Sequence, residues 1–141
     1  GVYEVDDATF AKIKDQFKAG CLSEDEILTT IKTCFNETGY LLDTHTAIGY
    51  GVLKQYQQET GDHTKTVLLS TASPYKFPES VYQAIYGEEL DVYTAIDKLS
   101  EKTGVPVPQA LAGIKEREVL HKEAIDKTEI ISFIKSEIEA M

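Results

Sequence analysis

The pattern of apolar and polar positions predicts a chain built mainly from helices. Apolar residues recur three or four positions apart over most of its length, which is typical of helices with one packed face. The clearest start is marked by Ser23 and Glu26, which are spaced as a capping box in front of the apolar positions Ile27 and Ile31. The predicted helices span residues 7–18, 24–38, 43–60, 78–86, 91–103 and 127–140.

One short segment has a different pattern. Residues 66–69 form an apolar run without alternation, which is typical of a strand covered on both faces in a parallel sheet. Residues 117–125 are a second, weaker strand candidate that would lead into the last helix. A strand at 66–69 needs neighbours, because its unpaired backbone groups would otherwise form an exposed edge. Either a second copy of the chain or polypeptide outside this sequence must pair with it, and we favour the second.

The predicted fold class is therefore α/β, with few strands of its own and a single segment over residues 1–141.

The helix at 43–60 carries Ala47, Gly49 and Gly51 in its first half. Interior glycines cost about 1 kcal/mol each relative to alanine, so their presence indicates that something approaches this helix closely. Tight packing and a bound ligand would both explain them.

Charge and cysteine content narrow the possible partners. The formal net charge of −10 disfavours nucleic acid and anionic membranes. No apolar run approaches the roughly 18 residues that a membrane span needs, so we expect a cytoplasmic protein.

We expect Cys21 and Cys34 to be reduced thiols, although a secreted chain could pair them. His45, His63 and His121 share no metal-ligand spacing, so no metal site is expected, and His63 and His121 are typical of solvated loops.

Candidate chemistry follows the predicted strand. Ser70, Thr71 and Ser73 come directly after it, and Lys76 precedes the next helix. Ligands of open α/β sheets bind at the carboxyl ends of strands, so these side chains are a candidate site. Hydroxyl side chains are equally typical of an ordinary turn, so the pattern does not decide between the two interpretations.

Two segments resemble a known family. Residues 71–77, TASPYKF, are similar to the TA-(His/Ser)-P-x-KF segment of threonine synthases, which are fold-type II pyridoxal-phosphate enzymes. Residues 39–51, GYLLDTHTAIGYG, are similar to the GYLLDPHTAVG segment of the same family, with Thr44 where proline is usual. Ser73 stands where histidine is more frequent, which leaves its role open. Two such motifs in the same order are a specific signal, whereas the rest of the chain aligns without sharp motifs.

The resemblance implies a three-layer αβα fold and the conversion of O-phospho-L-homoserine and water to L-threonine and phosphate. Pyridoxal 5'-phosphate would be the cofactor, because the reaction passes through carbanions that need an electron sink. Thr71 matches the family position whose hydroxyl contacts the pyridine nitrogen, and Ser73, two residues later, is the second candidate cofactor-binding residue. Lys76 and His45 are the candidate substrate-binding residues, although Lys76 could instead be a solvated side chain and His45 could simply bond a neighbouring carbonyl.

The resemblance also implies that the lysine that holds the cofactor lies in an N-terminal part outside this sequence. We therefore expect the chain to be a C-terminal part that is inactive by itself and has that N-terminal part as its partner. Two other functions fit the residues. One is an acidic helical module that binds another protein, and the other is a different fold-type II lyase with the same cofactor geometry.

Overall fold

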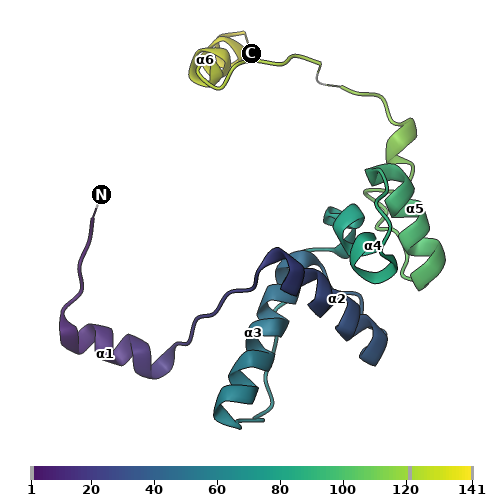
Figure 1. Ribbon diagram of the computed structural model, residues 1–141. Coiled ribbons are helices and arrows are strands. Elements are labelled where there is room, and N and C mark those ends of the chain that lie inside the picture. The colour runs from purple at the N-terminus through teal and green to yellow at the C-terminus, as the bar shows by residue number, and fades with distance from the viewer. Residues whose placement is uncertain (1, 121, 141) are drawn as a thin grey trace.

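The structure, a computed structural model, describes residues 2–120 and 122–140, and within these ranges it contains helices and no strand. Figure 1 shows that the middle of the chain forms a body from which both ends extend. The α-helices are α1 (Asp7–Gln16), α2 (Glu24–Thr38), α3 (Thr44–Thr60), α4 (Pro78–Tyr86), α5 (Val92–Thr103) and α6 (Ile130–Glu139). Two short 3-10 helices, η1 (Pro74–Lys76) and η2 (Ile114–Glu116), complete them. All six predicted helices are confirmed, and α6 begins three residues later than predicted.

Local capping explains where these helices begin and end. In α2 the Ser23 hydroxyl accepts from the Glu26 amide while the Glu26 carboxylate accepts from the Ser23 amide, which confirms the predicted capping box. The same helix ends at Gly39, whose φ of 72° is a left-handed conformation that side chains rarely adopt. These boundaries follow from the sequence because each depends on residues only a few positions apart.

A second type of cap recurs in three helices. An aspartate accepts hydrogen bonds from the backbone amide and the hydroxyl of a threonine three residues later, which satisfies amides of the first turn. These pairs are Asp6 with Thr9, Asp43 with Thr46, and Asp91 with Thr94. The Thr94 hydroxyl and amide hold the pKa of the exposed Asp91 carboxyl below its usual value.

The core lies among α2, α4 and α5. Ile31, Val81 and Leu99, one from each helix, are completely buried, and Tyr82 is almost so. The segment that joins α2 to α3 adds Leu41 and Leu42 to the same cluster. This core positions both segments that carry the sequence motifs, because one leads into α3 and the other leads into α4.

The small residues of α3 are explained by packing. A methyl group added to Gly51 would come within 2.5 Å of Leu22 Cδ1, and one added to Gly49 would come within 2.9 Å of Leu68 Cδ1. Side chains from two distant segments therefore lie directly on the helix backbone. Of the two explanations that the sequence allowed, close packing is the one seen in this structure.

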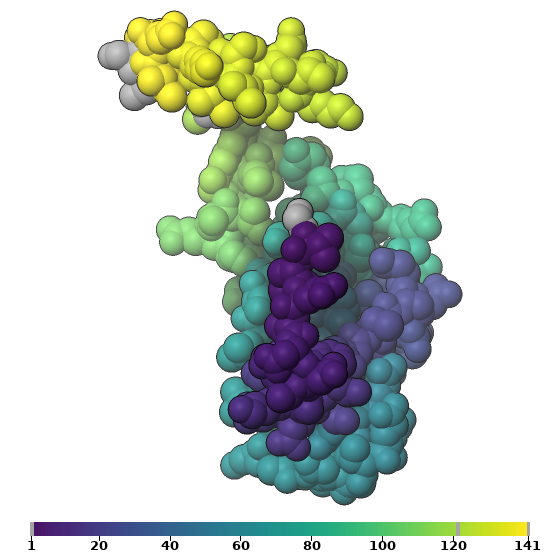
Figure 2. Space-filling view, turned by 90° about the vertical axis from the view of Figure 1, so that its left-hand side faces the viewer, coloured from purple at the N-terminus to yellow at the C-terminus, as the bar shows by residue number. Residues whose placement is uncertain are grey.

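Both terminal helices are amphipathic and unpacked. α1 and α6 contain no buried residue, and Figure 2 shows α6, in yellow, at one end of the molecule. The exposed apolar side chains are Phe10, Ile13 and Phe17 of α1, and Ile130, Ile131, Ile134 and Ile138 of α6. These faces have the pattern of packed helices but lack the surface against which they would pack.

The predicted strand at residues 66–69 is wrong for this structure. The segment has no regular secondary structure, and Val67 and Leu69 are 84% and 75% exposed. Only Leu68 is used in packing, against Gly49. A strand requires backbone partners, and the described chain supplies none, so its apolar pattern cannot become a sheet here. The second candidate, at 117–125, is irregular in its described residues as well.

No helix within the described residues is long and apolar enough to cross a membrane. This finding agrees with the absence of a long apolar run in the sequence.

The buried cap of α3 should contribute more stability than its exposed counterpart in α5. Asp43 is 2% exposed, so Asp43→Ala would leave the His45 and Thr46 amides without their acceptor and the Thr46 hydroxyl with only the Ser70 oxygen 3.4 Å away. We expect a loss of about 2–3 kcal/mol in the free energy of unfolding, against about 1 kcal/mol for Asp91→Ala. Urea unfolding followed by circular dichroism would measure both, and equal losses would contradict the importance of burial.

Thr44 occupies the first position of α3, which is the helical position that best accepts proline. Its amide has no hydrogen-bond partner within the described chain, and Asp43, with φ −80° and ψ 165°, has the extended conformation that favours a following proline. Thr44→Pro should therefore raise the free energy of unfolding by about 0.4–1 kcal/mol through the unfolded state. Thermal unfolding would measure this change, with Lys54→Pro inside α3 as the destabilising control.

Candidate functional site

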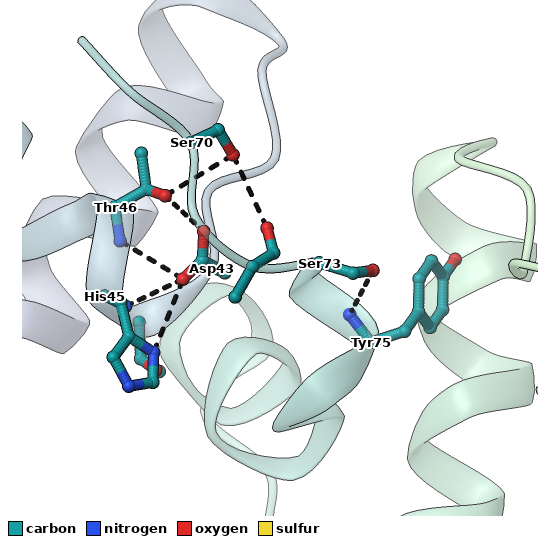
Figure 3. Close-up of polar contacts among 8 residues, drawn as sticks. Asp43, His45, Thr46, Ser70, Ser73 and Tyr75 are labelled. Atoms are coloured by element: carbon teal, nitrogen blue, oxygen red, sulfur yellow. Dashed lines mark hydrogen bonds and ion pairs between the residues drawn. The ribbon is translucent and has the colours of Figure 1, made fainter.

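The two motif segments, about twenty residues apart in the sequence, meet in space. Figure 3 shows residues 43–46 at the start of α3 lying beside the segment that contains Ser70. The Thr46 and Ser70 hydroxyl oxygens lie 3.4 Å apart, and the Ser70 hydroxyl donates to the Ala72 carbonyl at 3.4 Å. The rings of His45 and Phe77 also approach, with 5.6 Å between centroids. The motifs therefore form one continuous surface.

Asp43 is the polar centre of this surface. Its Oδ1 accepts from the amides of His45 at 2.8 Å and Thr46 at 3.1 Å, and its Oδ2 accepts from the Thr46 hydroxyl. The start of α3 also stabilises negative charge through the helix dipole. Both carboxylate oxygens thus have hydrogen-bond donors although the side chain is almost completely buried.

His45 lies at the edge of the same network. Its side chain is 51% exposed, and its Nδ1 lies 3.5 Å from Asp43 Oδ1 and 3.4 Å from Thr44 Oγ1. One face of the imidazole is tilted by 31° against the Phe77 ring. The ring is therefore contacted by both motif segments, while part of it stays open to solvent.

The Lys76 side chain lies near the ring of its neighbour Phe77. The lysine is exposed, and Nζ is 5.6 Å from the centroid of the Phe77 ring. Phe77 itself is 41% exposed, and its ring lies near both nitrogen-bearing side chains, His45 and Lys76. We call His45, Lys76 and Phe77 the basic edge of the site.

The structure places Ser73 away from His45. Its hydroxyl accepts from the Tyr75 amide at 3.2 Å, which caps η1, and in Figure 3 its side chain points toward Tyr75. Tyr75 is buried and donates its phenol hydrogen to the Val105 carbonyl at 2.5 Å, and burial raises its pKa. The centre of the second motif thus anchors the segment to the chain that follows α5.

Thr71 is exposed, and its hydroxyl has no hydrogen-bond partner within the described residues. It lies between Ser70, which belongs to the Asp43 network, and Ala72. Of the four residues that the sequence singled out, His45 and Lys76 therefore meet at Phe77, Thr71 adjoins the network through Ser70, and Ser73 serves the local turn.

The sequence placed Asp43 only at the start of a predicted helix and Phe77 only at the end of the second motif, without a role for either. The D-T-H-T spacing could have indicated Asp43, because an N-cap carboxylate lies near the side chain two residues later. The role of Phe77 had no comparable local signal, because its partner His45 is distant in the sequence.

The remaining titratable candidates do not form a second site. His63 is exposed in the loop after α3, as predicted, whereas His121 lies outside the described residues. Both cysteines are free, with Cys21 exposed and Cys34 buried. Within the described ranges, no group of three or more His, Cys, Asp or Glu side chains is arranged to hold a metal ion.

Comparisons with known proteins agree with the motifs. Residues 46–134 match the family model described as threonine synthase, C-terminal. The chain is 40% identical over 82 residues to threonine synthase from Haemophilus influenzae and 32% identical over 88 residues to that from Pseudomonas aeruginosa. It is also 32% identical over 89 residues to human threonine synthase-like 1.

The structure has a matching relative too. A crystal structure of pyridoxal-phosphate-bound threonine synthase from Brucella melitensis matches 82% of this chain with a TM-score of 0.58 and 30% sequence identity.

All of these matches cover a small part of the relative. The chain spans 21% of the Brucella structure, 18% of the two bacterial enzymes and 12% of the human protein. The matches cover 57% to 63% of this chain for the three sequence relatives. Because the family model alone covers well over half of the sequence, the chain belongs to the threonine synthase C-terminal family.

Proposed function

We propose that this chain is the C-terminal part of a pyridoxal-phosphate-dependent threonine synthase that converts O-phospho-L-homoserine and water to L-threonine and phosphate. The observation that carries the proposal is the meeting of the two motif segments at Asp43, His45 and Phe77. Family membership and the likeness to a pyridoxal-phosphate-bound relative support it.

The residues present fit the proposed cofactor at one position. The exposed, unpartnered Thr71 hydroxyl can donate to a pyridine nitrogen, since a hydroxyl is both donor and acceptor. When bound, pyridoxal phosphate supplies delocalisation of the negative charge that forms on substrate carbon atoms. A neutral hydroxyl at the ring nitrogen would moderate that electron withdrawal. The Ser73 hydroxyl already accepts a hydrogen bond from the Tyr75 amide, so Ser73 would contribute mainly by holding the segment in place.

The basic edge fits a phosphorylated substrate. A protein with a formal net charge of −10 repels anions in general, so binding a phosphate ester needs local cations or hydrogen-bond donors. Lys76 offers a flexible ammonium group and His45 offers a ring nitrogen, and both side chains lie near the Phe77 ring. We propose that these two side chains contact the substrate phosphate.

The rest of the enzyme would come from polypeptide outside this sequence. That part would supply the cofactor-holding lysine and the strands that pair with residues 66–69 in a three-layer αβα fold. The exposed Val67 and Leu69, together with the unpacked faces of α1 and α6, are surfaces that such polypeptide could cover. The same exposed faces also favour a second candidate, an acidic helical module that binds an unrelated protein.

Reconstitution separates these two candidates. Residues 1–141 by themselves should produce no threonine from O-phosphohomoserine, because the proposed cofactor lysine is absent. Addition of the preceding part of the same protein and pyridoxal phosphate should restore both the yellow cofactor absorbance and threonine formation, measured by chromatography. Activity of the chain alone would refute the proposal, and an isolated chain that stays monomeric and ignores the added part would favour the interaction module.

The Thr71 hydroxyl can be tested in the full-length protein. Thr71→Val keeps the shape of the side chain but removes its hydrogen bond, so kcat/KM should fall by at least about tenfold and the cofactor absorption band should shift. Thr66→Val is the matched control, because Thr66 is exposed nearby and bonds only locally to the Thr64 carbonyl. Equal effects of the two substitutions would remove Thr71 from the cofactor site.

A further inference from the structure

We infer that Asp43 and Thr44 are positioning residues that engage Nδ1 of His45 and leave Nε2 as the ring nitrogen available to the substrate phosphate. The orientation of the ring stands on contacts within this chain. The binding of a phosphate ester by the oriented ring rests on the proposed function. The sequence motif places these three residues next to each other, but only the structure assigns them different roles.

Asp43 is a suitable fixed point because it cannot move without breaking the start of α3. Its carboxylate is buried and already bonded to two amides and one hydroxyl of the first helical turn. Since a carboxylate only accepts hydrogen bonds, its Oδ1 favours a proton on the His45 nitrogen 3.5 Å away. With the proton of the neutral ring on Nδ1, Nε2 is the nitrogen that takes up the second proton, and only the resulting Nε2–H can donate to a phosphate oxygen.

Phe77 limits the alternative orientation of the ring. The imidazole lies against Phe77 at 5.6 Å between centroids, so rotation about its side-chain bonds is restricted on that face. Figure 3 shows one ring nitrogen joined to Asp43 by a dashed line and the other pointing away from the network. Nε2 is thus the ring nitrogen that faces away from the Asp43 network. A protonated ring would donate Nε2–H there to a phosphate oxygen.

Thr44 adds a contact that proline cannot make. Its Oγ1 lies 3.4 Å from His45 Nδ1, and a proline at this position would have no side-chain hydrogen-bonding group. The hydroxyl can accept the Nδ1 proton when Asp43 does not, so Nδ1 has two neighbours and Nε2 is the nitrogen left free. The threonine therefore strengthens an orientation that Asp43 already favours.

Nuclear magnetic resonance of the ring nitrogens tests the orientation without any assay of activity. In the ¹⁵N-histidine-labelled chain at about pH 8, where histidine is ordinarily neutral, His45 should have its proton mainly on Nδ1. Asp43→Asn keeps the cap, since asparagine caps as well as aspartate, but the neutral amide accepts more weakly. The Nδ1–H fraction of His45 should then fall toward that of the exposed His63, which serves as the internal reference.

Thr44→Pro should lower the same fraction by less, and Asp91→Asn, in the equivalent cap of α5, should leave it unchanged. A His45 that matches His63 in the unsubstituted chain would overturn the proposed orientation.

Kinetics of the full-length protein tests whether this orientation serves the substrate. Asp43→Asn should lower kcat/KM for O-phosphohomoserine about tenfold, mainly through KM, because His45 would lose a fixed direction. The same substitution in a His45→Ala background should have little further effect, since the residue that it positions is gone. An equal loss in both backgrounds would overturn the link to substrate binding while leaving the nitrogen assignment intact. Absence of any synthase activity would instead refute the proposed function.

Discussion

The buried Asp43 carboxylate constrains the arrangement of both motif segments. A buried charge is tolerated only where hydrogen bonds replace the water that it has lost, and here the first turn of α3 supplies them. The hydrogen bonds to Asp43 fix the first turn, and the Thr46 hydroxyl then lies beside Ser70, which directly precedes the second motif. One electrostatic requirement therefore sets the helix start, the direction of His45 and the path of the chain toward Phe77.

Most of the helices could be predicted because their boundaries depend on neighbouring residues. The capping box at Ser23 and the left-handed Gly39 need only a few positions to be recognised, and both are present as expected. Contacts within the candidate site depend on distant residues instead. The approach of Phe77 to His45 and of Leu68 to Gly49 has no local signal. The sequence therefore indicated which small residues and motifs to examine, but it did not identify the residues that contact them.

The wrong prediction at residues 66–69 has a physical cause of the same kind. An apolar run indicates that the side chains of a segment favour burial. A strand also needs neighbouring strands that form hydrogen bonds with its amides and carbonyls. Within the described chain there are no such neighbours, and Val67 and Leu69 are exposed. The exposed apolar faces of α1 and α6 have the same explanation. In each case the sequence pattern describes packing that is not present among the described residues.

The residues of the candidate site also differ in whether their contacts are made within this chain. The Asp43 cap, the Tyr75 anchor and the Phe77 contact are all made within this chain, so the basic edge is organised without the rest of the protein. The hydroxyl of Thr71 has no partner in the described structure. Under the proposed function, the preorganised basic edge would suit recognition of a phosphate, and the free Thr71 hydroxyl would suit contact with the cofactor.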